Sequence, residues 1–431
     1  MHTLAFLDPG HFHAALTLGD RHPRVRDELV VHASKGPELD DFLELVDAFN
    51  HRRERPTGWR VTVHAGERAL ERLVTDRPGD VVVLAGRNDR KLATIRRLHD
   101  AGFHVLADKP WMTGPDGLDD LRHVLAGGPL AVEMMTGRHE ITARLAERLV
   151  REVDVFGGFV DGGGDEPGIE ITSVHHLEKT VDGRALRRPP WYFDVRVQGD
   201  GIADIPTHMV DQAQRLVRAA DADPAADAPR LELLAARTWS TSVPRALFAR
   251  VTGLPEFPPE LATVVAGSEL AYRGNAALAF RAGPVRVALD TRWDLSAPSG
   301  GGDTHRSLLR GTRSLVRVEQ GPATGFRRRL SIEPRDEPDR VEAALRRALA
   351  AWQGTHPGLS VEPAAAGWEI RVPPSLDAGH ERHFPLVLAE FLALVDDGRP
   401  PARLAADTLA KYTLLAQAAV AACERDGAAR P

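Results

Sequence analysis

Residues 81–110, VVVLAGRNDRKLATIRRLHDAGFHVLADKP, decide the fold that the sequence predicts. The stretch opens on a continuous run of aliphatic, mostly β-branched residues, which is typical of a strand buried on both faces. A polar turn leads into an amphipathic helical segment that ends at Gly102, and a second apolar run follows. Strand, helix and strand in this order form a parallel βαβ unit with a right-handed crossover.

The same alternation extends in both directions from this stretch. Apolar, strand-like runs alternate with helical segments at 3–7, 29–33, 60–64, 81–86, 103–108 and 129–135. We therefore expect an α/β fold that begins with a doubly wound parallel sheet over residues 1–135, the Rossmann arrangement of a dinucleotide-binding domain. Such sheets bind their ligands at the carboxyl ends of the strands.

After residue 135 strand-like runs follow one another with few helices between them. These runs are VFGGFVDG (155–162), IEITSVHH (169–176), YFDVRVQG (192–199), ELLAARTWST (232–241), ALAFRAG (277–283), VRVALDTRW (285–293) and SLVRVEQ (314–320). One strong helix is expected from about residue 205 to 220, and two more from about residues 383 and 402. Residues 136–431 therefore predict an α+β domain with a large, mainly antiparallel open sheet, for substrate binding and oligomerisation. The terminal helices could return to pack on the first domain.

Composition excludes several classes of protein. The chain has 431 residues and a formal net charge of −6, which argues against nucleic acid or an anionic membrane as a partner. A single cysteine, Cys423, rules out a disulfide framework. The first 20 residues do not resemble a signal peptide, and no apolar run reaches the 18 or so residues needed to span a bilayer. We expect a soluble, cytoplasmic protein.

The turn after the first strand reads Asp8-Pro9-Gly10-His11-Phe12-His13, where a dinucleotide fingerprint G-x-G-x-x-G is expected. Only the middle glycine of the fingerprint, Gly10, is present. Free N–H groups at the following helix start would still suit a phosphate, although an ordinary strand–turn–helix explains the segment equally well. The second strand ends at Ser34 and Lys35 without the usual ribose-binding acid, and a hydroxyl and a cation would suit the 2′-phosphate of NADP.

Lysine is scarce in this chain, with five residues against 50 arginines. A retained lysine favours chemistry that needs a compact ammonium group. Lys109 follows the fifth strand in Ala107-Asp108-Lys109-Pro110, and Pro110 biases it away from helix. Lys109 is therefore expected at the strand's carboxyl end beside the nicotinamide, with a surface loop lysine as the alternative.

Asp204 and His208 are four residues apart at the start of the helix in GDGIADIPTHMVD, 199–211. This spacing places them on one face, and a carboxylate beside an imidazole can orient a general base. Asp204 is expected to be the N-cap, so a capping aspartate and a core histidine are the structural alternative.

Polar and aromatic residues elsewhere in the second domain suit a hydroxyl-rich ligand. The candidates for substrate binding are His176, Lys179, Trp191, Asp194, Asp211 and His305. No metal site is expected, since the alternative of His175, His176 and His208 lacks a diagnostic spacing. The glycine-rich segment APSGGGD, 297–303, predicts a surface loop.

These motifs together resemble the Gfo/Idh/MocA family of oxidoreductases. FHVLADKP resembles its Glu-Lys-Pro signature, and GDGIADIPTHMVDQ resembles its glycine-rich Asp-x-x-x-His-x-x-Asp helix. The resemblance implies a Rossmann domain, an open-sheet domain and bound NAD(P), with NAD favoured and NADP not excluded. It identifies Lys109, Asp204 and His208 as catalytic residues. It identifies the cofactor-binding residues as Asp8, Gly10, His11, Phe12, His13, Ser34, Lys35, Asn88, Asp108, Lys109 and Pro110.

Two departures from the family pattern are the DPGHFH loop and Asp108 in place of glutamate; the DPGHFHA start resembles a subgroup of uncharacterised oxidoreductases. The expected activity is hydride transfer between NAD(P) and a secondary hydroxyl or ketone of a sugar, polyol or glycoside. One alternative is an NAD-dependent enzyme that cleaves glycosides by transient oxidation and elimination. Another is a ligand-sensing regulator, which would not need the three catalytic residues. An uncovered sheet face predicts a homo-oligomer.

Overall fold

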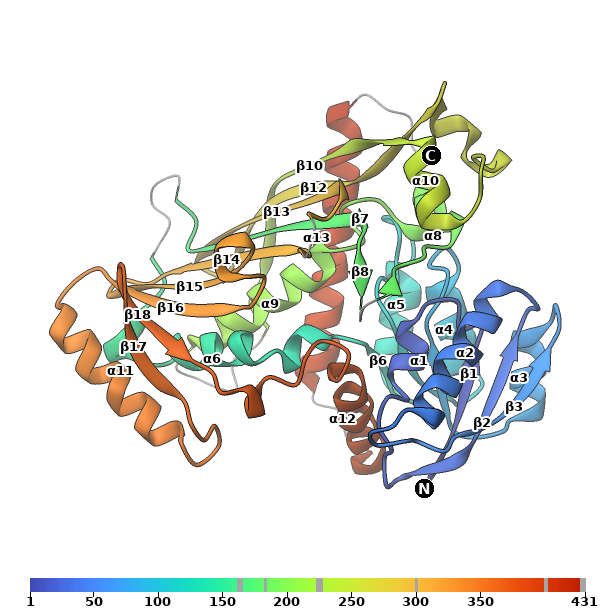
Figure 1. Cartoon of the computed structure of the whole chain (residues 1–431), viewed down its shortest axis with the longest axis horizontal. Coiled ribbons are helices and arrows are strands. Elements are labelled where there is room, and N and C mark those ends of the chain that lie inside the picture. The colour runs from blue at the N-terminus through green and yellow to red at the C-terminus, as the bar shows by residue number, and fades with distance from the viewer. Residues whose placement is uncertain (161–165, 182–183, 222–227, 299–300, 399–401, 427–431) are drawn as a thin grey trace. The chain divides into compact units, whose positions relative to one another are not determined.

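A computed structural model describes residues 1–160, 166–181, 184–221, 228–298, 301–398 and 402–426 (Figure 1). The chain divides into two compact units. The first unit contains residues 1–139 and 378–409, and the second contains residues 140–377 and 410–431. None of the described helices combines the length and the apolar character that crossing a membrane requires.

The described part of the first unit contains a six-stranded parallel sheet in the order β3-β2-β1-β4-β5-β6. Its strands are β1 His2–Leu7, β2 Val25–Ala33, β3 Arg60–Ala65, β4 Val81–Leu84, β5 His104–Ala107 and β6 Ala131–Glu133. Its helices are α1 His13–Leu16, α2 Pro37–His51, α3 Ala69–Asp76, α4 Lys91–Asp100, α5 Leu118–Leu125 and α12 His383–Asp397, with the 3₁₀ turn η1 Thr136–His139. The strand order reverses between β1 and β4, as in a Rossmann sheet. The predicted parallel α/β sheet is confirmed.

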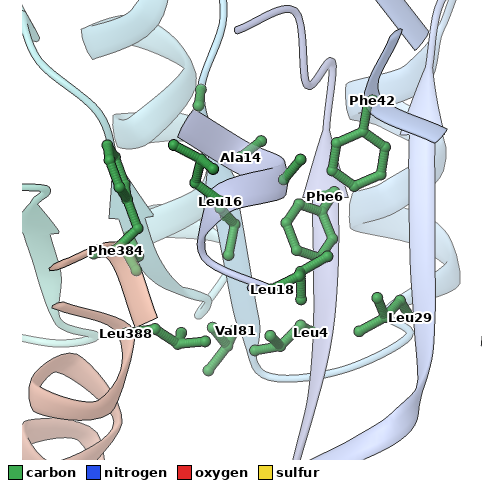
Figure 2. Close-up of a cluster of buried hydrophobic side chains, with 14 of the residues drawn as sticks. Leu4, Phe6, Ala14, Leu16, Leu18, Leu29, Phe42, Val81, Phe384 and Leu388 are labelled. Atoms are coloured by element: carbon green, nitrogen blue, oxygen red, sulfur yellow. The ribbon is translucent and has the colours of Figure 1, made fainter. Parts of the chain in front are cut away.

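The core of the first unit joins segments that are far apart in the sequence. Phe384 and Leu388 of α12 are buried in the same hydrophobic cluster as Leu4 of β1 and Leu16 of α1. In Figure 2, Leu388 lies next to Val81, and Val81 lies between Leu388 and Leu4. Helix α12 is therefore an integral part of the first unit.

The second unit is built on a large sheet with strand order β10-β12-β13-β7-β14-β15-β16-β18-β17 among its described residues, and β11 pairs with β12. Its strands are β7 Ile169–Glu178, β10 Leu231–Pro244, β11 Val265–Ala266, β12 Glu269–Ala282, β13 Val285–Ser296, β14 Thr304–Arg310, β15 Ser314–Gln320, β16 Arg329–Pro334, β17 Ser360–Ala364 and β18 Gly367–Arg371. Neighbours are antiparallel except β13 and β7, which run parallel. This confirms the predicted open, mainly antiparallel sheet.

The helices of this unit are more numerous than the sequence predicted. They are α6 Ile141–Leu149, α7 Val153–Phe156, α8 Val195–Gln198, α9 Pro206–Ala219, α10 Arg245–Thr252 and α11 Pro338–Trp352; η2 Pro190–Phe193, η3 Pro259–Val264, η4 Pro322–Thr324 and η5 Pro374–Leu376 are 3₁₀ turns, and β8 Thr180–Val181 and β9 Arg184–Ala185 form a small ribbon. The final helix, α13 Ala402–Asp426, contributes residues to both units. Helices α6 and α9 pack on the large sheet.

Two predicted strands were wrong. YFDVRVQG forms part of η2 and then α8, because Asp194 accepts the backbone N–H of Arg196 and so caps α8. Gly199, at φ 90°, ends this helix. VFGGFVDG begins in α7 rather than in a strand, and residues 161–162 of this run lie outside the described residues.

Candidate functional site

The carboxyl edge of the parallel sheet gathers most of the residues that the sequence assigned to the cofactor. Asp8 follows β1, Ser34 follows β2 and Lys109 follows β5, and Asn88 lies in the turn after β4. Asp8 Oδ1 accepts the backbone N–H of Ser34 at 2.9 Å, which links the ends of β1 and β2. The parallel register therefore assembles residues that are far apart in the sequence.

The β1–α1 loop keeps the backbone geometry of a phosphate-binding turn although its first and third glycines are missing. Asp8 has φ 39°, in the left-handed region that a glycine would favour. A Cβ on Gly10 would lie 2.9 Å from the carboxylate of Glu38, so the loop passes close to the start of α2. His11 N–H donates to Ala85 O at 3.1 Å and holds the loop against β4.

Two carboxylates therefore lie at the position where a Rossmann domain receives the adenosine ribose. Asp8 approaches from β1, and Glu38 approaches from the first turn of α2 beside Gly10. Burial raises the pKa of Asp8, while the Ser34 N–H and the charge of Arg87 oppose this rise. Arg87 also lies 3.7 Å from Glu38. Glu38 was not predicted, because this acid does not directly follow the second strand.

A buried ion pair underlies this edge. The ammonium of Lys91 contacts Asp108 Oδ1 and donates to Asn88 Oδ1 at 2.6 Å. The Lys91 side chain has no exposed surface, and that of Asp108 is 4% exposed. Burial lowers the pKa of Lys91, and the charge of Asp108 opposes this effect. The pair connects the turn after β4 with the end of β5.

The second oxygen of Asp108 faces two imidazoles. Asp108 Oδ2 lies 3.5 Å from His11 Nδ1 and 3.5 Å from His13 Nδ1. Burial lowers the pKa of both histidines well below the usual value; for His11 the next largest contribution is the neighbouring His13, and for His13 it is Lys109. Both imidazoles are therefore neutral at neutral pH.

The other predicted residues of this loop have simpler surroundings. Phe12 packs against the core of the first unit, and Lys35 is exposed. Lys109 is half-buried, and the peptide that joins it to the buried Pro110 is cis.

In the second unit, Asp204 and His208 lie at the start of α9. The prediction that Asp204 caps this helix was wrong, because α9 begins at Pro206 and Ile205 is its N-cap. Asp200 forms the preceding turn, where its carboxylate accepts the N–H groups of Ile202 and Ala203 at 2.9 and 3.4 Å. Asp204 itself is buried, with 4% of its surface exposed.

The charge of Asp204 acts on two buried tyrosines, one of which is also packed against an arginine. Burial raises the pKa of Tyr192 and Tyr272, and the charge of Asp204 raises both further. The guanidinium of Arg188 lies 4.6 Å above the ring of Tyr192 and 5.1 Å from that of Trp293. The phenols remain protonated and can donate hydrogen bonds.

Asp303 gathers two histidines and a lysine. Its carboxylate lies 3.1 Å from His175 Nδ1 and 3.4 Å from His176 Nδ1, and it contacts the ammonium of Lys179. Although the carboxylate is largely buried, these partners hold its pKa well below the usual value. Asp303 was missed because it ends the glycine-rich segment 297–303, of which residues 299–300 lie outside the described residues.

A polar row crosses the sheet at this point. Ser173 is in register with Thr291 of β13 and with His305 of β14, and His305 is in register with Gln320 of β15. Ser173 Oγ lies 3.3 Å from Thr291 Oγ1 and 3.1 Å from His175 Nε2. The row thus joins the Asp303 cluster through His175.

Helix α9 passes over the same face of the sheet. Gln212 Nε2 donates to Ser307 Oγ at 3.4 Å, and Ser307 Oγ in turn lies 2.8 Å from His305 Nε2. Because residues four apart share one side of a helix, His208 is on the side of α9 that faces the sheet. Within the second unit, the structure therefore brings His208 toward the polar row.

Three other predicted substrate residues have structural surroundings. Trp191 is buried in the aromatic core, and Asp194 caps α8 and pairs with Arg196 at 2.8 Å. Asp211 is buried on α9, 3.9 Å from the ammonium of Lys411.

The comparisons with known proteins agree with this architecture. Residues 145–423 match the family described as "Putative oxidoreductase C terminal domain". The crystal structure of a putative oxidoreductase from Parabacteroides merdae is 32% identical, with a TM-score of 0.93 over 98% of each chain. No curated protein matches the chain.

More distant structures share the fold. GenD2 from gentamicin A biosynthesis, solved in complex with NAD, is 16% identical, with a TM-score of 0.58 over 99% of this chain and 95% of its own. KijD10, a 3-ketoreductase from Actinomadura kijaniata solved with NADP and TDP-benzene, is 14% identical, with a TM-score of 0.57 over 97% of each chain.

Proposed function

Because this chain belongs to the oxidoreductase family that its residues 145–423 match, we propose that it transfers a hydride between a nicotinamide dinucleotide and a secondary hydroxyl or ketone of a sugar, polyol or glycoside. The observation that carries the proposal is the carboxyl edge of the parallel sheet, where Asp8, Asn88 and Lys109 follow three different strands. This edge is where Rossmann domains bind dinucleotides. The glycoside-cleaving and regulatory alternatives have no observation in their favour and are not proposed.

The loop and the strand ends fit a dinucleotide. Gly10 has no side chain that could obstruct a pyrophosphate. Asp8, which stands where the fingerprint has its first glycine, already has a left-handed backbone conformation. Asn88 and Lys109 would bind the nicotinamide end. The nicotinamide supplies the hydride acceptor or donor of the reaction.

We expect NAD to bind more tightly than NADP. Asp8 and Glu38 place negative charge beside the loop, and a 2′-phosphate would be repelled there. Asp8 takes the place of the acid that is missing after β2, since its carboxylate is held at that strand by the Ser34 N–H. Equilibrium binding measured by nucleotide fluorescence tests this preference. In the variant Glu38→Gln, the dissociation constants for NADH and NADPH should differ less than in the wild type.

In the proposed reaction, three side chains act on the alcohol. His208 accepts the hydroxyl proton as the hydride leaves for the nicotinamide. Lys109 donates a hydrogen bond to the reacting oxygen and stabilises its developing negative charge. Asp204 orients His208 or shares the proton transfer.

The polar row of the second unit supports a hydroxyl-rich substrate. Ser173, Thr291 and Gln320 offer donors and acceptors on one sheet face, together with the imidazole of His305. Ser173 and Thr291 are buried, whereas His305 and Gln320 are half-buried, so only the β14 and β15 end of the row is open to a ligand. A hydroxyl-bearing ligand could hydrogen-bond with His305 and Gln320 at this open end.

A panel of sugars, polyols and glycosides, each with NAD and with NADP, tests the proposal. Nicotinamide reduction, read by absorbance, must be accompanied by a stoichiometric keto product, identified by mass spectrometry. Product formation without nicotinamide turnover, or the absence of any nucleotide binding, would contradict the proposed reaction.

We further propose that the protein forms a homo-oligomer through the outer face of its large sheet.

A further inference from the structure

Three potential metal ligands meet at the carboxyl ends of β1 and β5. A nitrogen from His11, a nitrogen from His13 and a carboxylate oxygen of Asp108 all lie within 4.8 Å of one another. We propose that these three residues bind a divalent transition-metal ion, with Zn²⁺ as the best match, and leave one coordination position open to an oxygen ligand. This metal site is independent of the proposed hydride transfer, because metal binding can be measured without nucleotide or substrate.

The distances already resemble those of an occupied site. Tetrahedral zinc with bonds of about 2.0–2.1 Å places its ligand atoms roughly 3.3 Å apart. Asp108 Oδ2 lies 3.5 Å from the Nδ1 atoms of His11 and His13. A few tenths of an ångström of adjustment at these two edges would therefore form the site.

One ligand atom lacks its ordinary hydrogen bond. Among the described residues, His11 Nδ1 is shielded from water and has no hydrogen-bond partner. Leaving a buried polar atom in this state is unfavourable. Coordination would satisfy the nitrogen through its lone pair.

The surroundings orient the carboxylate. Lys91 contacts Asp108 Oδ1 and is itself fixed by Asn88, so Oδ2 is the oxygen left facing the imidazoles. Carboxylates that bind metals usually have such a hydrogen bond on the second oxygen. The rings are also held by packing: those of His11 and His13 meet edge to face at 3.9 Å, and that of His13 lies 4.6 Å from Phe384.

The donor set selects the kind of ion. Mg²⁺ and Ca²⁺ prefer oxygen ligands, whereas imidazole suits Zn²⁺, Co²⁺ and Fe²⁺. The nearby ammonium of Lys91 disfavours a weakly bound cation, so the bonds to nitrogen must supply the affinity. Two imidazoles and one carboxylate form the ligand set of catalytic metal sites that keep an open position.

Solvent and small oxygen ligands can reach the proposed metal site. The side chains of His11 and His13 are 23% and 16% exposed, so solvent reaches the rings although it does not reach His11 Nδ1. A hydroxyl, carbonyl or water oxygen could occupy the open position, where the ion would act as a Lewis acid.

Two other clusters in the same unit serve as controls. His32, His64 and Asp76 form one, and His99, Asp100 and His123 form the other. In the second cluster Asp100 already accepts a 2.7 Å hydrogen bond from His123, and both of these side chains are exposed. Substitution of His99 and His123 therefore removes one buried and one exposed histidine without touching the proposed site.

The test is a Co²⁺ titration of the full-length, chelator-treated protein. We expect one equivalent of Co²⁺ with visible absorption of a four- or five-coordinate site, displaced by Zn²⁺. His11→Gln and His13→Gln should each weaken binding by at least about 100-fold, a loss at the upper end of that seen for residues that only support metal ligands. The double variant His99→Gln/His123→Gln should bind as the wild type does.

The proposal is overturned if the wild type shows no stoichiometric Co²⁺ binding, or if the His11 and His13 variants retain it. Circular dichroism of each variant checks the fold, and His32→Gln serves as a second control for loss of a buried histidine. NADH fluorescence on the same samples separates the two hypotheses, because nucleotide binding and Co²⁺ binding are read independently.

Discussion

Lys91 and Asp108 form a buried ion pair, although 17 residues of sequence separate them. Removal of one partner leaves the other charge buried and uncompensated. We therefore expect Lys91→Met to lower the free energy of unfolding by about 3–5 kcal/mol, measured by urea denaturation. The double variant Lys91→Met/Asp108→Leu should recover part of this loss. If the double variant were less stable than the single one, the carboxylate would not be the source of the cost.

Lys109 is expected to be needed for turnover. Lys109→Ala and Lys109→Arg should both reduce kcat by roughly 10²–10⁴-fold, because a planar guanidinium cannot replace a compact donor at the reacting oxygen. Steady-state kinetics with the substrate found in the panel measure this loss. Near-normal turnover in the arginine variant would show that Lys109 supplies only charge.

His208 should govern the pH dependence of alcohol oxidation. Only the neutral imidazole can accept a proton, so the rate should rise with pH along a single limb and then level off. His208→Asn should remove the limb and leave a low, nearly flat rate, while NADH fluorescence shows unchanged nucleotide binding. A variant that kept both the limb and the activity would make His208 structural and assign the base to another group.

His305 should contribute to acid sensitivity. Burial, aided by the charge of Arg328 and opposed by Glu140, lowers its pKa to about 3. The unfolded chain therefore binds a proton below about pH 6.5 that the folded chain does not, so stability falls as the pH falls through this window. His305→Gln should reduce the slope of unfolding free energy against pH by up to about 1.4 kcal/mol per unit between pH 6.5 and 4. An unchanged slope in urea titrations would contradict this burial effect.

The oligomer proposed above predicts more than one chain per particle in light scattering at micromolar concentration. Along β13 the buried Val287 and Leu289 alternate with the half-buried Ala288, which points to the outer face of the sheet. Ala288→Lys should shift the protein toward monomer. Asp47→Lys, the same kind of change on an exposed helix of the first unit, should not. A monomeric wild type would refute the proposal.

The sequence predicted the elements better than it predicted the contacts between them. A continuous apolar run such as 81–86 is compatible with few structures other than a buried strand, and this run forms β4. YFDVRVQG was misread because its aromatic and β-branched residues suit strands, while the Asp194 cap that makes part of it helical depends on local hydrogen bonds.

The site was predicted in part for the same reason. Asp8 and Lys109 lie one and two residues after their strands, so the rule for parallel sheets places them at one edge. Asp303 meets His175 across 128 residues of sequence, and no periodicity reports such a contact. Lys91 was counted among the few lysines, yet its burial follows only from the meeting of the β4 turn with the end of β5.

The core shared by β1 and α12 has a consequence for how the protein is made. Phe384 and Leu388 complete the cluster around Leu4, so the first unit cannot finish its core when residue 139 leaves the ribosome. About 240 more residues must be added before segment 378–409 begins to emerge, which takes about 12–48 s at typical rates of translation. During that interval the apolar surface that α12 later covers is open to chaperones and to other nascent chains. Slow translation of the middle of the message should therefore lower the yield of folded protein more than slow translation of its first third.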